Sequence, residues 1–333
     1  MLPSIVSMFR FPNSLPSRSI SSKYSISMRP SPFSSTRRSC RSLSTGFSPG
    51  IAAHTVRCAS VVKGHNPMRY SFMSFSCPDL SLQAMLDTAV DLGYAGIEPR
   101  VDANHAHGVE TSLSPAQRRD VRARVADSAA DICCIASSSR YSEPATLEEN
   151  LAQTRREIGL AGDLEVPVLR VFGGQIAEGI DRDAAIDNLS AALARVADEA
   201  GQAGVTVCVE THDAWCNPHH VAAVLANVNH PAVAANWDVL HPVRAEGMSV
   251  AESLAVLGPW IRHVHMHDAT LEPGRIQYVP MGTGAIDHRE VIQGLHEIDY
   301  NGCLSGEWIG YSPWQEHLPY EIGQLRSYEA DLA

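Results

Sequence analysis

The chain from residue 68 onward alternates between two hydrophobic patterns. Short apolar runs rich in β-branched residues are typical of buried strands, and longer segments with apolar residues at helical spacing are typical of amphipathic helices. Strands are predicted at residues 69–75, 94–97, 132–136, 166–172, 205–209, 233–237, 261–266 and 302–306. Helices are predicted at residues 82–92, 115–126, 147–161, 183–203, 219–226, 250–257, 288–296 and 320–333. The pattern therefore predicts eight strands and eight helices in strict alternation.

Strict alternation of strands and helices favours a parallel sheet with helices outside it, and eight units favour closure into a barrel. The alternative is an open, doubly wound sheet, which normally carries a glycine-rich turn after its first strand. The segment that follows the first predicted strand, Ser76-Cys-Pro-Asp79, has no such glycines. We therefore predict an α/β fold, a (β/α)8 TIM barrel that forms a single domain over residues 68–333.

Residues 1–67 differ from the rest of the chain in composition. They contain no Asp or Glu, are rich in Ser and Arg, and carry repeated Pro. Three interpretations stay open: a mis-assigned start with Met68 as the natural first residue, an organellar transit peptide, or an export signal around Arg37-Arg38. The first interpretation implies a cytoplasmic protein, and the other two imply an organelle or export. In each case we expect a disordered leader.

The charge of the chain is unevenly distributed. Nine of the 26 Lys and Arg residues lie in residues 1–67, which leaves 17 against all 37 acidic residues and a formal charge of −20 for the rest. Both lysines, Lys23 and Lys63, also lie in the leader. An acidic, lysine-free barrel disfavours binding to a nucleic acid backbone, and no apolar segment is long enough to span a membrane. We expect a small-molecule partner, and the sequence leaves homo-oligomers open.

The eight cysteines show no Cys-x-x-Cys spacing, and several of them lie inside strand-like runs. Such cysteines are typically reduced thiols that fill the core as small hydrophobic residues. We therefore expect a reducing compartment.

Four of the predicted strands end in a residue that can bind a metal, namely Glu210, Asp238, His265 and Glu307. The carboxyl ends of the strands of a parallel barrel meet at one mouth, where the functional sites of such barrels lie. Three carboxylates close together resist ionising unless a cation organises them. One imidazole with three carboxylates suits one divalent ion, Mn²⁺ or Mg²⁺ by preference, with Zn²⁺ or Co²⁺ as alternatives.

Several motifs around these residues resemble those of the xylose isomerase-like TIM-barrel family. They are Gly93-Tyr-Ala-Gly-Ile-Glu98, Val209-Glu-Thr-His-Asp213, Asp238-Val-Leu-His241, His265-Met-His-Asp268, Pro280-Met-Gly-Thr-Gly-Ala-Ile-Asp287 and Gly306-Glu307. The family includes sugar-phosphate isomerases and epimerases and, more remotely, endonuclease IV. The resemblance covers residues 68 to about 310. It implies that Glu210, Asp238, His265 and Glu307 bind one divalent metal, and that His241 reaches the substrate or the metal.

The activity that this resemblance implies is isomerisation or epimerisation of a small sugar, keto-sugar or polyol-derived carbonyl compound. Glu210 and Glu307 would take and return a proton through an enediolate that the metal stabilises. One base would favour isomerisation and two bases on opposite faces would permit epimerisation, and the sequence leaves both open. His267 stands where many relatives have Lys, and Thr283 where many have Glu. The resemblance therefore does not identify a particular sugar as the substrate.

Three other functions remain as alternatives. A cyclic-polyol (inosose-type) dehydratase would use the same metal and base. An endonuclease IV-like phosphodiesterase would need a multi-zinc cluster and a basic face, and the charge of the barrel opposes the latter. A non-catalytic binding barrel would have little reason to keep four metal-binding residues.

Further candidates for substrate contacts surround the predicted metal ligands. His212, His241 and His267 follow three of the strands, and Trp308 directly follows Glu307. Core packing is the alternative interpretation for Trp308. His105 and His107 lie in the loop after the second strand and could close over the substrate, although a polar loop without that role fits equally well.

Overall fold

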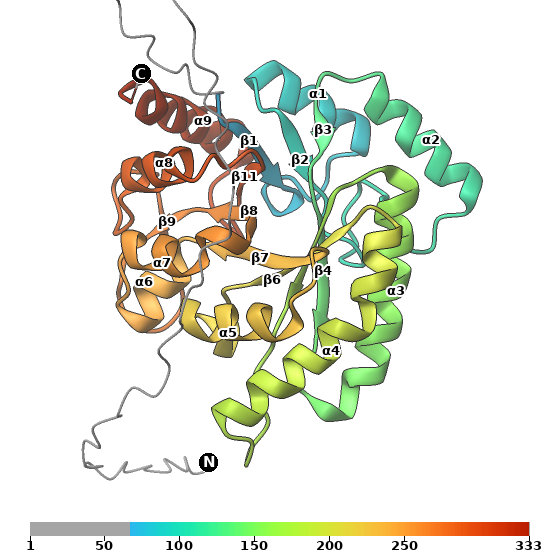
Figure 1. Cartoon of the computed structure of the whole chain (residues 1–333). Helices are drawn as coiled ribbons and strands as arrows, with labels where there is room; N and C mark the ends of the chain where they lie inside the picture. Colours follow the sequence, from blue (N-terminus) through green and yellow to red (C-terminus); the bar gives the residue numbers. More distant parts are fainter. Residues whose placement is uncertain (1–66, 333) are drawn as a thin grey trace, which may run out of the picture. The chain divides into compact units, whose positions relative to one another are not determined.

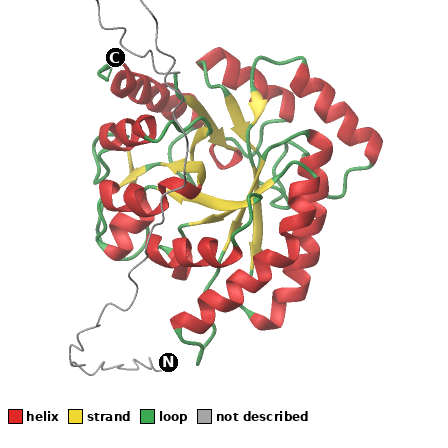
Figure 2. Cartoon of the chain, in the orientation of Figure 1, coloured by secondary structure: helices red, strands yellow, loops and turns green. Residues whose placement is uncertain are grey.

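The computed structural model describes residues 67–332, and our predictions for residues 1–66 lie outside this range. Parallel strands form the centre and the helices surround them (Figures 1 and 2). The sheet has the strand order β3-β2-β1-β11-β8-β7-β6-β5-β4. The strands are β1 (Arg69–Met73), β2 (Gly96–Glu98), β3 (Asp131–Ile132), β4 (Ile135–Arg140), β5 (Val168–Phe172), β6 (Thr206–Glu210), β7 (Val233–Asp238), β8 (Ile261–Met266) and β11 (Cys303–Gly306).

The two outermost strands of this order, β3 and β4, are halves of one continuous run. Only Cys133 and Cys134 separate them, so β3 pairs with β2 on one side while β4 pairs with β5 on the other. A parallel bridge between Arg100 and Ala136 extends the contact between the β2 and β4 segments. The sheet is thereby closed, and the predicted TIM barrel is confirmed.

Nine α-helices lie in the described part of the chain. They are α1 (Leu82–Leu92), α2 (Pro115–Ala126), α3 (Leu147–Leu164), α4 (Arg182–Gln202), α5 (Pro218–Val228), α6 (Leu240–Glu246), α7 (Val250–Leu257), α8 (His288–Glu297) and α9 (Trp314–Ala330). Local capping signals fix several of their ends. Ser114 and Ser249 form capping boxes at the starts of α2 and α7, and Gly93 ends α1 in the left-handed conformation. None of the helices in residues 67–332 is long and apolar enough to cross a membrane.

Besides the short antiparallel pair at residues 268–269 and 278–279, the structure differs from the predicted elements at three main places. The third strand is interrupted between β3 and β4, and α6 is an additional short helix directly after β7. The last helix begins at Trp314 although Pro319 lies inside it. A proline lacks the N–H that a helix interior uses, which is why the sequence favours a later start. Burial of His317 and Leu318 against the barrel accompanies the earlier start.

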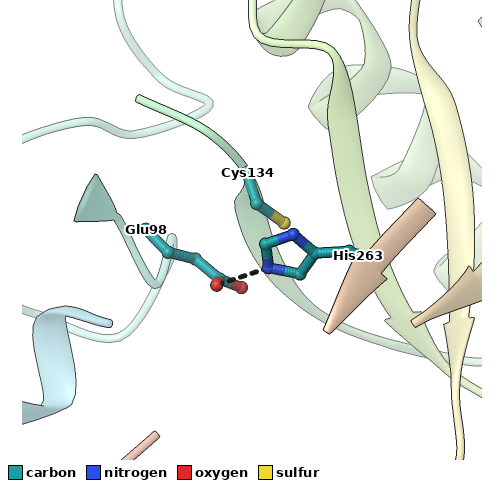
Figure 3. Close-up of side chains that lie close together, drawn as sticks. All are labelled: Glu98, Cys134 and His263. Atoms are coloured by element: carbon teal, nitrogen blue, oxygen red, sulfur yellow. Dashed lines mark hydrogen bonds and ion pairs between the residues drawn. The ribbon is translucent and has the colours of Figure 1, made fainter. Parts of the chain in front are cut away.

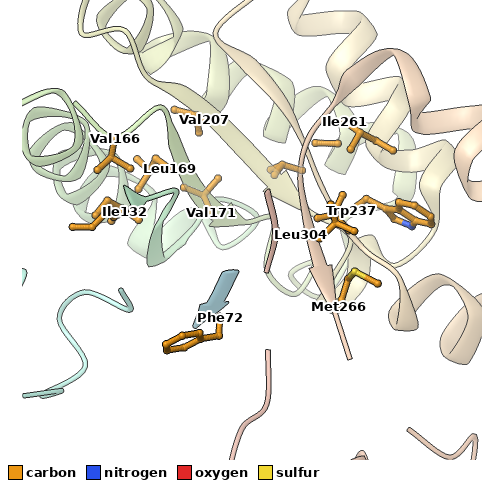
Figure 4. Packing of buried hydrophobic residues seen from close by; sticks show 14 of the residues in the cluster. Phe72, Ile132, Val166, Leu169, Val171, Val207, Trp237, Ile261, Met266 and Leu304 are labelled. Carbon is orange, nitrogen blue, oxygen red and sulfur yellow. The ribbon is translucent and has the colours of Figure 1, made fainter. Parts of the chain in front are cut away.

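Alternate residues of each strand face the helices and the barrel interior. The helix-facing residues, such as Leu169, Val207 and Trp237, belong to one large hydrophobic cluster (Figure 4). A small second cluster consists of Cys133, Cys134, Val168, Cys208, Ala234 and Cys303. The six cysteines among the described residues are buried free thiols, as predicted. Cys208 lies two residues before Glu210 on β6, so apolar side chains fill the interior below the level at which the charged side chains begin.

Candidate metal centre

The four predicted metal ligands come from the carboxyl ends of neighbouring strands. Glu210 is the last residue of β6 and Asp238 the last of β7, while His265 lies in β8 and Glu307 directly follows β11. The strand register pairs Asp238 with His265. Glu210, Asp238 and His265 are completely buried, and Glu307 is 5% exposed. The closed barrel therefore brings to one level four side chains that are distant in the sequence.

The imidazole of His265 lies between two of the carboxylates. Its Nδ1 atom is 3.2 Å from Glu210 Oε1 and 3.4 Å from Glu307 Oε2. One ligand atom from each of the four residues, Asp238 included, lies within 4.8 Å of the others. Groups at these separations can converge on a single ion.

The charges at this level depend on one another. Burial alone would lower the pKa of His265, but the negative charges of Glu98, Glu210 and Glu307 outweigh it and hold the pKa well above its usual value. Burial alone would raise the pKa of Glu307, but His265 and Arg170 lower it to about 2. The imidazoles of His267 and His241 likewise overcome burial and lower the pKa of Asp238. The carboxylates of Glu307 and Asp238 are therefore ionised and stabilised by neighbouring positive charge.

Two buried oxygens in this cluster fit a bound cation. Among the described residues, neither Glu210 Oε2 nor Asp238 Oδ2 takes part in a hydrogen bond. The other oxygen of Asp238, Oδ1, accepts from the backbone N–H groups of Leu240 and His241 at 2.8 and 3.0 Å. These bonds fix the carboxylate, while Oδ2 is left with ion-pair contacts to imidazoles only. Glu210 Oε2 likewise lies 3.3 Å from Arg170 Nε, and because neither oxygen takes part in a hydrogen bond, both keep lone pairs that a divalent ion would bind.

A row of imidazoles continues from the cluster along the mouth of the barrel. His267 Nε2 lies 3.0 Å from Asp238 Oδ2, and its Nδ1–H donates to the backbone oxygen of Glu307 at 2.9 Å. The ring centroids of His267 and His241 are 6.0 Å apart, and those of His241 and His212 are 4.4 Å apart. The structure therefore brings these three predicted substrate-binding histidines together beside the four predicted metal ligands.

A family comparison agrees with this geometry. The model of the xylose isomerase-like TIM barrel family matches residues 86–328. The chain belongs to this family.

Solved structures with the same fold cover about four-fifths of the chain. A probable 3-DHS dehydratase from Bacillus anthracis has a TM-score of 0.65 and 22% identity, covering 78% of this chain and 99% of its own. An L-ribulose 3-epimerase has a TM-score of 0.62 and 20% identity, covering 80% of this chain and 97% of its own. A xylose isomerase-like barrel from Mycobacterium smegmatis, in complex with magnesium, has a TM-score of 0.60 and 19% identity. The match covers 80% of this chain and 98% of the other. No curated protein sequence matches the chain.

The remaining substrate-binding candidates of this xylose isomerase-like barrel lie in other surroundings. Trp308 is 1% exposed, and its ring packs on His317 of α9 with centroids 5.0 Å apart. His107 has both ring nitrogens bound to backbone groups, because Nε2 contacts Arg100 O at 3.1 Å and Nδ1 accepts from Val109 N–H at 2.9 Å. His105 Nδ1 lies 2.8 Å from Ser74 Oγ. A substrate contact by any of the three stays a prediction.

Two buried charged residues that contact the predicted metal ligands were not among the predicted site residues. Arg170, in β5, places Nε 3.3 Å from Glu210 Oε2 and donates from Nη1 to Ser137 O at 2.9 Å. Burial alone would lower the pKa of Arg170, but Glu210 and Glu307 raise it. The sequence signal is a single arginine inside the apolar run Val168-Leu-Arg-Val-Phe172, because a lone buried charge requires a partner.

Glu98 is the second such residue. It ends β2 in the same way as Glu210 ends β6, and it is completely buried. His265 and His263 lie within hydrogen-bonding distance of its carboxylate. Burial alone would raise its pKa, but these two imidazoles hold it well below its usual value. The rule that selected the other strand-end carboxylates also selects Glu98.

Proposed function

We propose that this chain is a divalent-metal-dependent enzyme that isomerises or epimerises a small sugar, keto-sugar or polyol-derived carbonyl compound. The observation that carries the proposal is the convergence of Glu210, Asp238, His265 and Glu307 on one buried level, with two carboxylate oxygens left without hydrogen bonds. These four residues would hold one ion. Three carboxylates and one imidazole favour Mg²⁺ or Mn²⁺, with Zn²⁺ or Co²⁺ as alternatives.

The protein would supply both charge balance and bases. A bound divalent cation would act as a Lewis acid for the negative charge that develops when a proton leaves the carbon next to a carbonyl. Arg170 adds one further positive charge beside Glu210, so the three carboxylates are balanced when the ion is present. Glu210 and Glu307 would take and return the proton as general bases and acids. Their positions on either side of His265 Nδ1 suit two proton transfers within one site.

The row of His212, His241 and His267 would bind the hydroxyl groups of the substrate. Imidazoles can donate and accept hydrogen bonds, and these three lie directly beside the predicted metal ligands. Trp308, His105 and His107 would contribute only if the substrate, or a movement of the loops, reached them.

A dehydratase of a cyclic polyol is the second candidate. Removal of a proton next to a carbonyl is also the first step of such an elimination, and one of the structural neighbours is described as a probable 3-DHS dehydratase. The structural similarity to an L-ribulose 3-epimerase supports the isomerase or epimerase candidate in the same way. Both comparisons are below 25% identity and support the fold, so the substrate must decide between the two.

Metal content tests the first part of this proposal. Wild-type protein should bind about one divalent ion per chain, because four ligands define one site, whereas a nuclease-type cluster would bind about three. Asp238→Ala should abolish binding in calorimetry while circular dichroism stays unchanged, since the lost carboxylate belongs to the site and not to the packed core. Asp163→Ala is the matched control, because Asp163 is an exposed carboxylate that pairs with Arg118 on the outside of the barrel. Unchanged metal affinity in Asp238→Ala would refute the four-ligand assignment.

Solvent deuterium exchange tests the chemistry. The metal-loaded protein would be incubated in D₂O with keto-sugars and inositol derivatives. A substrate should gain deuterium at the carbon next to its carbonyl, and loss of water in the product would identify the dehydratase. If no compound of either class exchanged hydrogen, the proposed proton transfer would lose its support.

A further inference from the structure

Glu98 lies in the barrel interior directly behind the predicted metal ligand His265. Its Oε1 accepts from His265 Nε2 at 3.1 Å, and its Oε2 accepts from His263 Nε2 at 2.8 Å. Figure 3 shows the carboxylate of Glu98 directed at the His263 ring, with the Cys134 thiol beside them. One carboxylate from β2 thus joins two histidines of β8 across the interior of the barrel.

The contact between Glu98 and His265 determines which nitrogen of the imidazole is available to an ion. A carboxylate only accepts, so Nε2 must carry the proton that lies between them. Without an ion, Nδ1 also faces carboxylates and carries a proton, and a bound cation would displace that proton and take the Nδ1 lone pair. Nδ1 is the atom that lies 3.2 Å from Glu210 and 3.4 Å from Glu307. With a cation bound, the lone pair of His265 would therefore be directed at the other predicted ligands.

The surroundings of Glu98 keep this arrangement rigid. Glu98, His263 and His265 are all 0% exposed, so water cannot replace either hydrogen bond. The second bond, to His263, prevents the carboxylate from rotating away from His265. Both oxygens of Glu98 have a partner, and loss of this carboxylate would leave two buried imidazole nitrogens unsatisfied.

We propose that Glu98 is a positioning residue for the metal centre, which fixes the tautomer and the orientation of His265 and increases the basicity of its Nδ1 atom. This inference rests on the proposed metal site, on which Glu98 would act through His265 without binding the ion itself. Loss of a carboxylate that accepts from the second nitrogen of a metal-binding histidine typically lowers metal affinity by about 10- to 100-fold. His263 would support Glu98 without touching the ion.

Three variants separate the parts of this role. Glu98→Ala removes both hydrogen bonds and should weaken Mn²⁺ affinity by about 10- to 100-fold in calorimetry. Glu98→Gln keeps an oxygen that accepts from His265 but lacks the charge, so its affinity should lie between those of wild type and Glu98→Ala. Glu157→Gln is the matched control, since Glu157 is also buried but accepts from Ser137 and Ser139 between α3 and β4, and it should bind Mn²⁺ like wild type.

A spectroscopic measurement separates positioning from a general loss of stability. In the Co²⁺-loaded protein, the Nε2 proton of a histidine bound through Nδ1 gives a paramagnetically shifted ¹H signal that disappears when it exchanges with solvent. Wild type should show a slowly exchanging signal, because Glu98 accepts from this proton and both residues are 0% exposed. In Glu98→Gln this proton should shift and exchange faster, while the circular dichroism of the metal-free protein stays that of wild type.

Each outcome bears on a different claim. Wild-type affinity in both Glu98 variants, or an unchanged histidine signal in Glu98→Gln, would overturn the positioning role and leave the metal site intact. Absence of metal binding by wild type would overturn the proposed function and this inference together. If Glu157→Gln lost as much Mn²⁺ affinity as Glu98→Gln, the effect would be due to general destabilisation, and the positioning role would be overturned.

Discussion

Ionisable side chains lie inside the barrel at the level where its strands end. Glu98, Arg170, Glu210, His265 and Glu307 are at most 5% exposed and lie in one connected set of contacts. An isolated buried charge is strongly unfavourable, so each of these groups depends on its neighbours. Apolar residues would fill the same space without this desolvation penalty, which favours a functional role for the charged set.

Glutamine substitutions separate metal binding from proton transfer within this set. Gln keeps the shape and one oxygen ligand of Glu but cannot accept a proton at neutral pH. Glu210→Gln and Glu307→Gln should therefore retain some metal while turnover falls by about 10²–10⁴-fold. The measurement combines metal content with the rate of product formation on the substrate found by deuterium exchange.

The two glutamine variants also test the arrangement of the bases. If Glu210 and Glu307 act on opposite faces of the same carbon, one variant should still exchange substrate hydrogen with solvent without completing the conversion. Near-normal turnover in both variants would exclude them as the proton-transferring residues.

At the scale of elements, the connection between β8 and α8 is organised by a single carboxylate. Asp268 accepts from the backbone N–H groups of Gly282, Gly284 and Ile286 at 2.9, 2.9 and 3.2 Å. The same connection carries a short antiparallel pair, β9 (Asp268–Ala269) and β10 (Tyr278–Val279). The motif at residues 280–287 thus has a structural reason, because its backbone wraps around Asp268.

Gly284 is a position in this connection where a side chain has no room beside Asp268. A Cβ atom there would lie 2.2 Å from Asp268 Oδ1 and 2.7 Å from the backbone oxygen of Ala269. Gly284→Ala should therefore destabilise the protein by about 1–3 kcal/mol, because the backbone must move away from Asp268. Urea denaturation measures the free energy of unfolding.

A glycine in open space provides the control for this prediction. Gly323 lies on the exposed side of α9, and a Cβ atom there would meet nothing within 4 Å. Gly323→Ala should stabilise the protein by roughly 0.5–1 kcal/mol, since alanine favours a helix. A Gly284→Ala variant as stable as wild type would contradict the role of Asp268 as the fixed point of this connection.

At the scale of the whole molecule, the first strand completes the barrel. β1 pairs with β2 on one side and with β11 on the other, so the start of the described chain meets its end. The backbone N–H of Met68 donates to Glu329 Oε1 at 2.5 Å, and Tyr70 Oη donates to Glu329 Oε2 at 3.1 Å. These contacts join residues that are far apart in the sequence, separated by 261 and 259 positions.

A chain that begins at Met68 keeps all of these elements. Residues 68–333 expressed alone should be folded and monodisperse and should bind the metal like the full chain, because β1 begins at Arg69 and the new terminal ammonium would lie beside Glu329. Size-exclusion chromatography and calorimetry, with the full-length chain as the control, measure this. Aggregated protein, or loss of metal binding, would show that residues 1–67 are needed by the barrel.

The sequence by itself determined the order of elements and the four strand-end residues. Strands such as 261–266 and helices such as 82–92 are local, since hydrophobic period and capping residues are properties of short segments. The (β/α)8 fold was predicted from the alternation of these elements. The predicted ends of three strands placed Glu210, Asp238 and Glu307 directly after them. Parallel strands in a closed barrel place all of these positions at the same mouth.

Only the tertiary structure decided which side chains share contacts inside the barrel. Arg170 lies beside Glu210, and Glu98 lies behind His265, because the register between strands and the closure at Cys133-Cys134 set distances between residues that no local pattern relates. The early start of α9 before Pro319 was decided in the same way, by burial against the barrel. Local preferences act over a few residues, whereas the pairing of buried charges depends on the completed barrel.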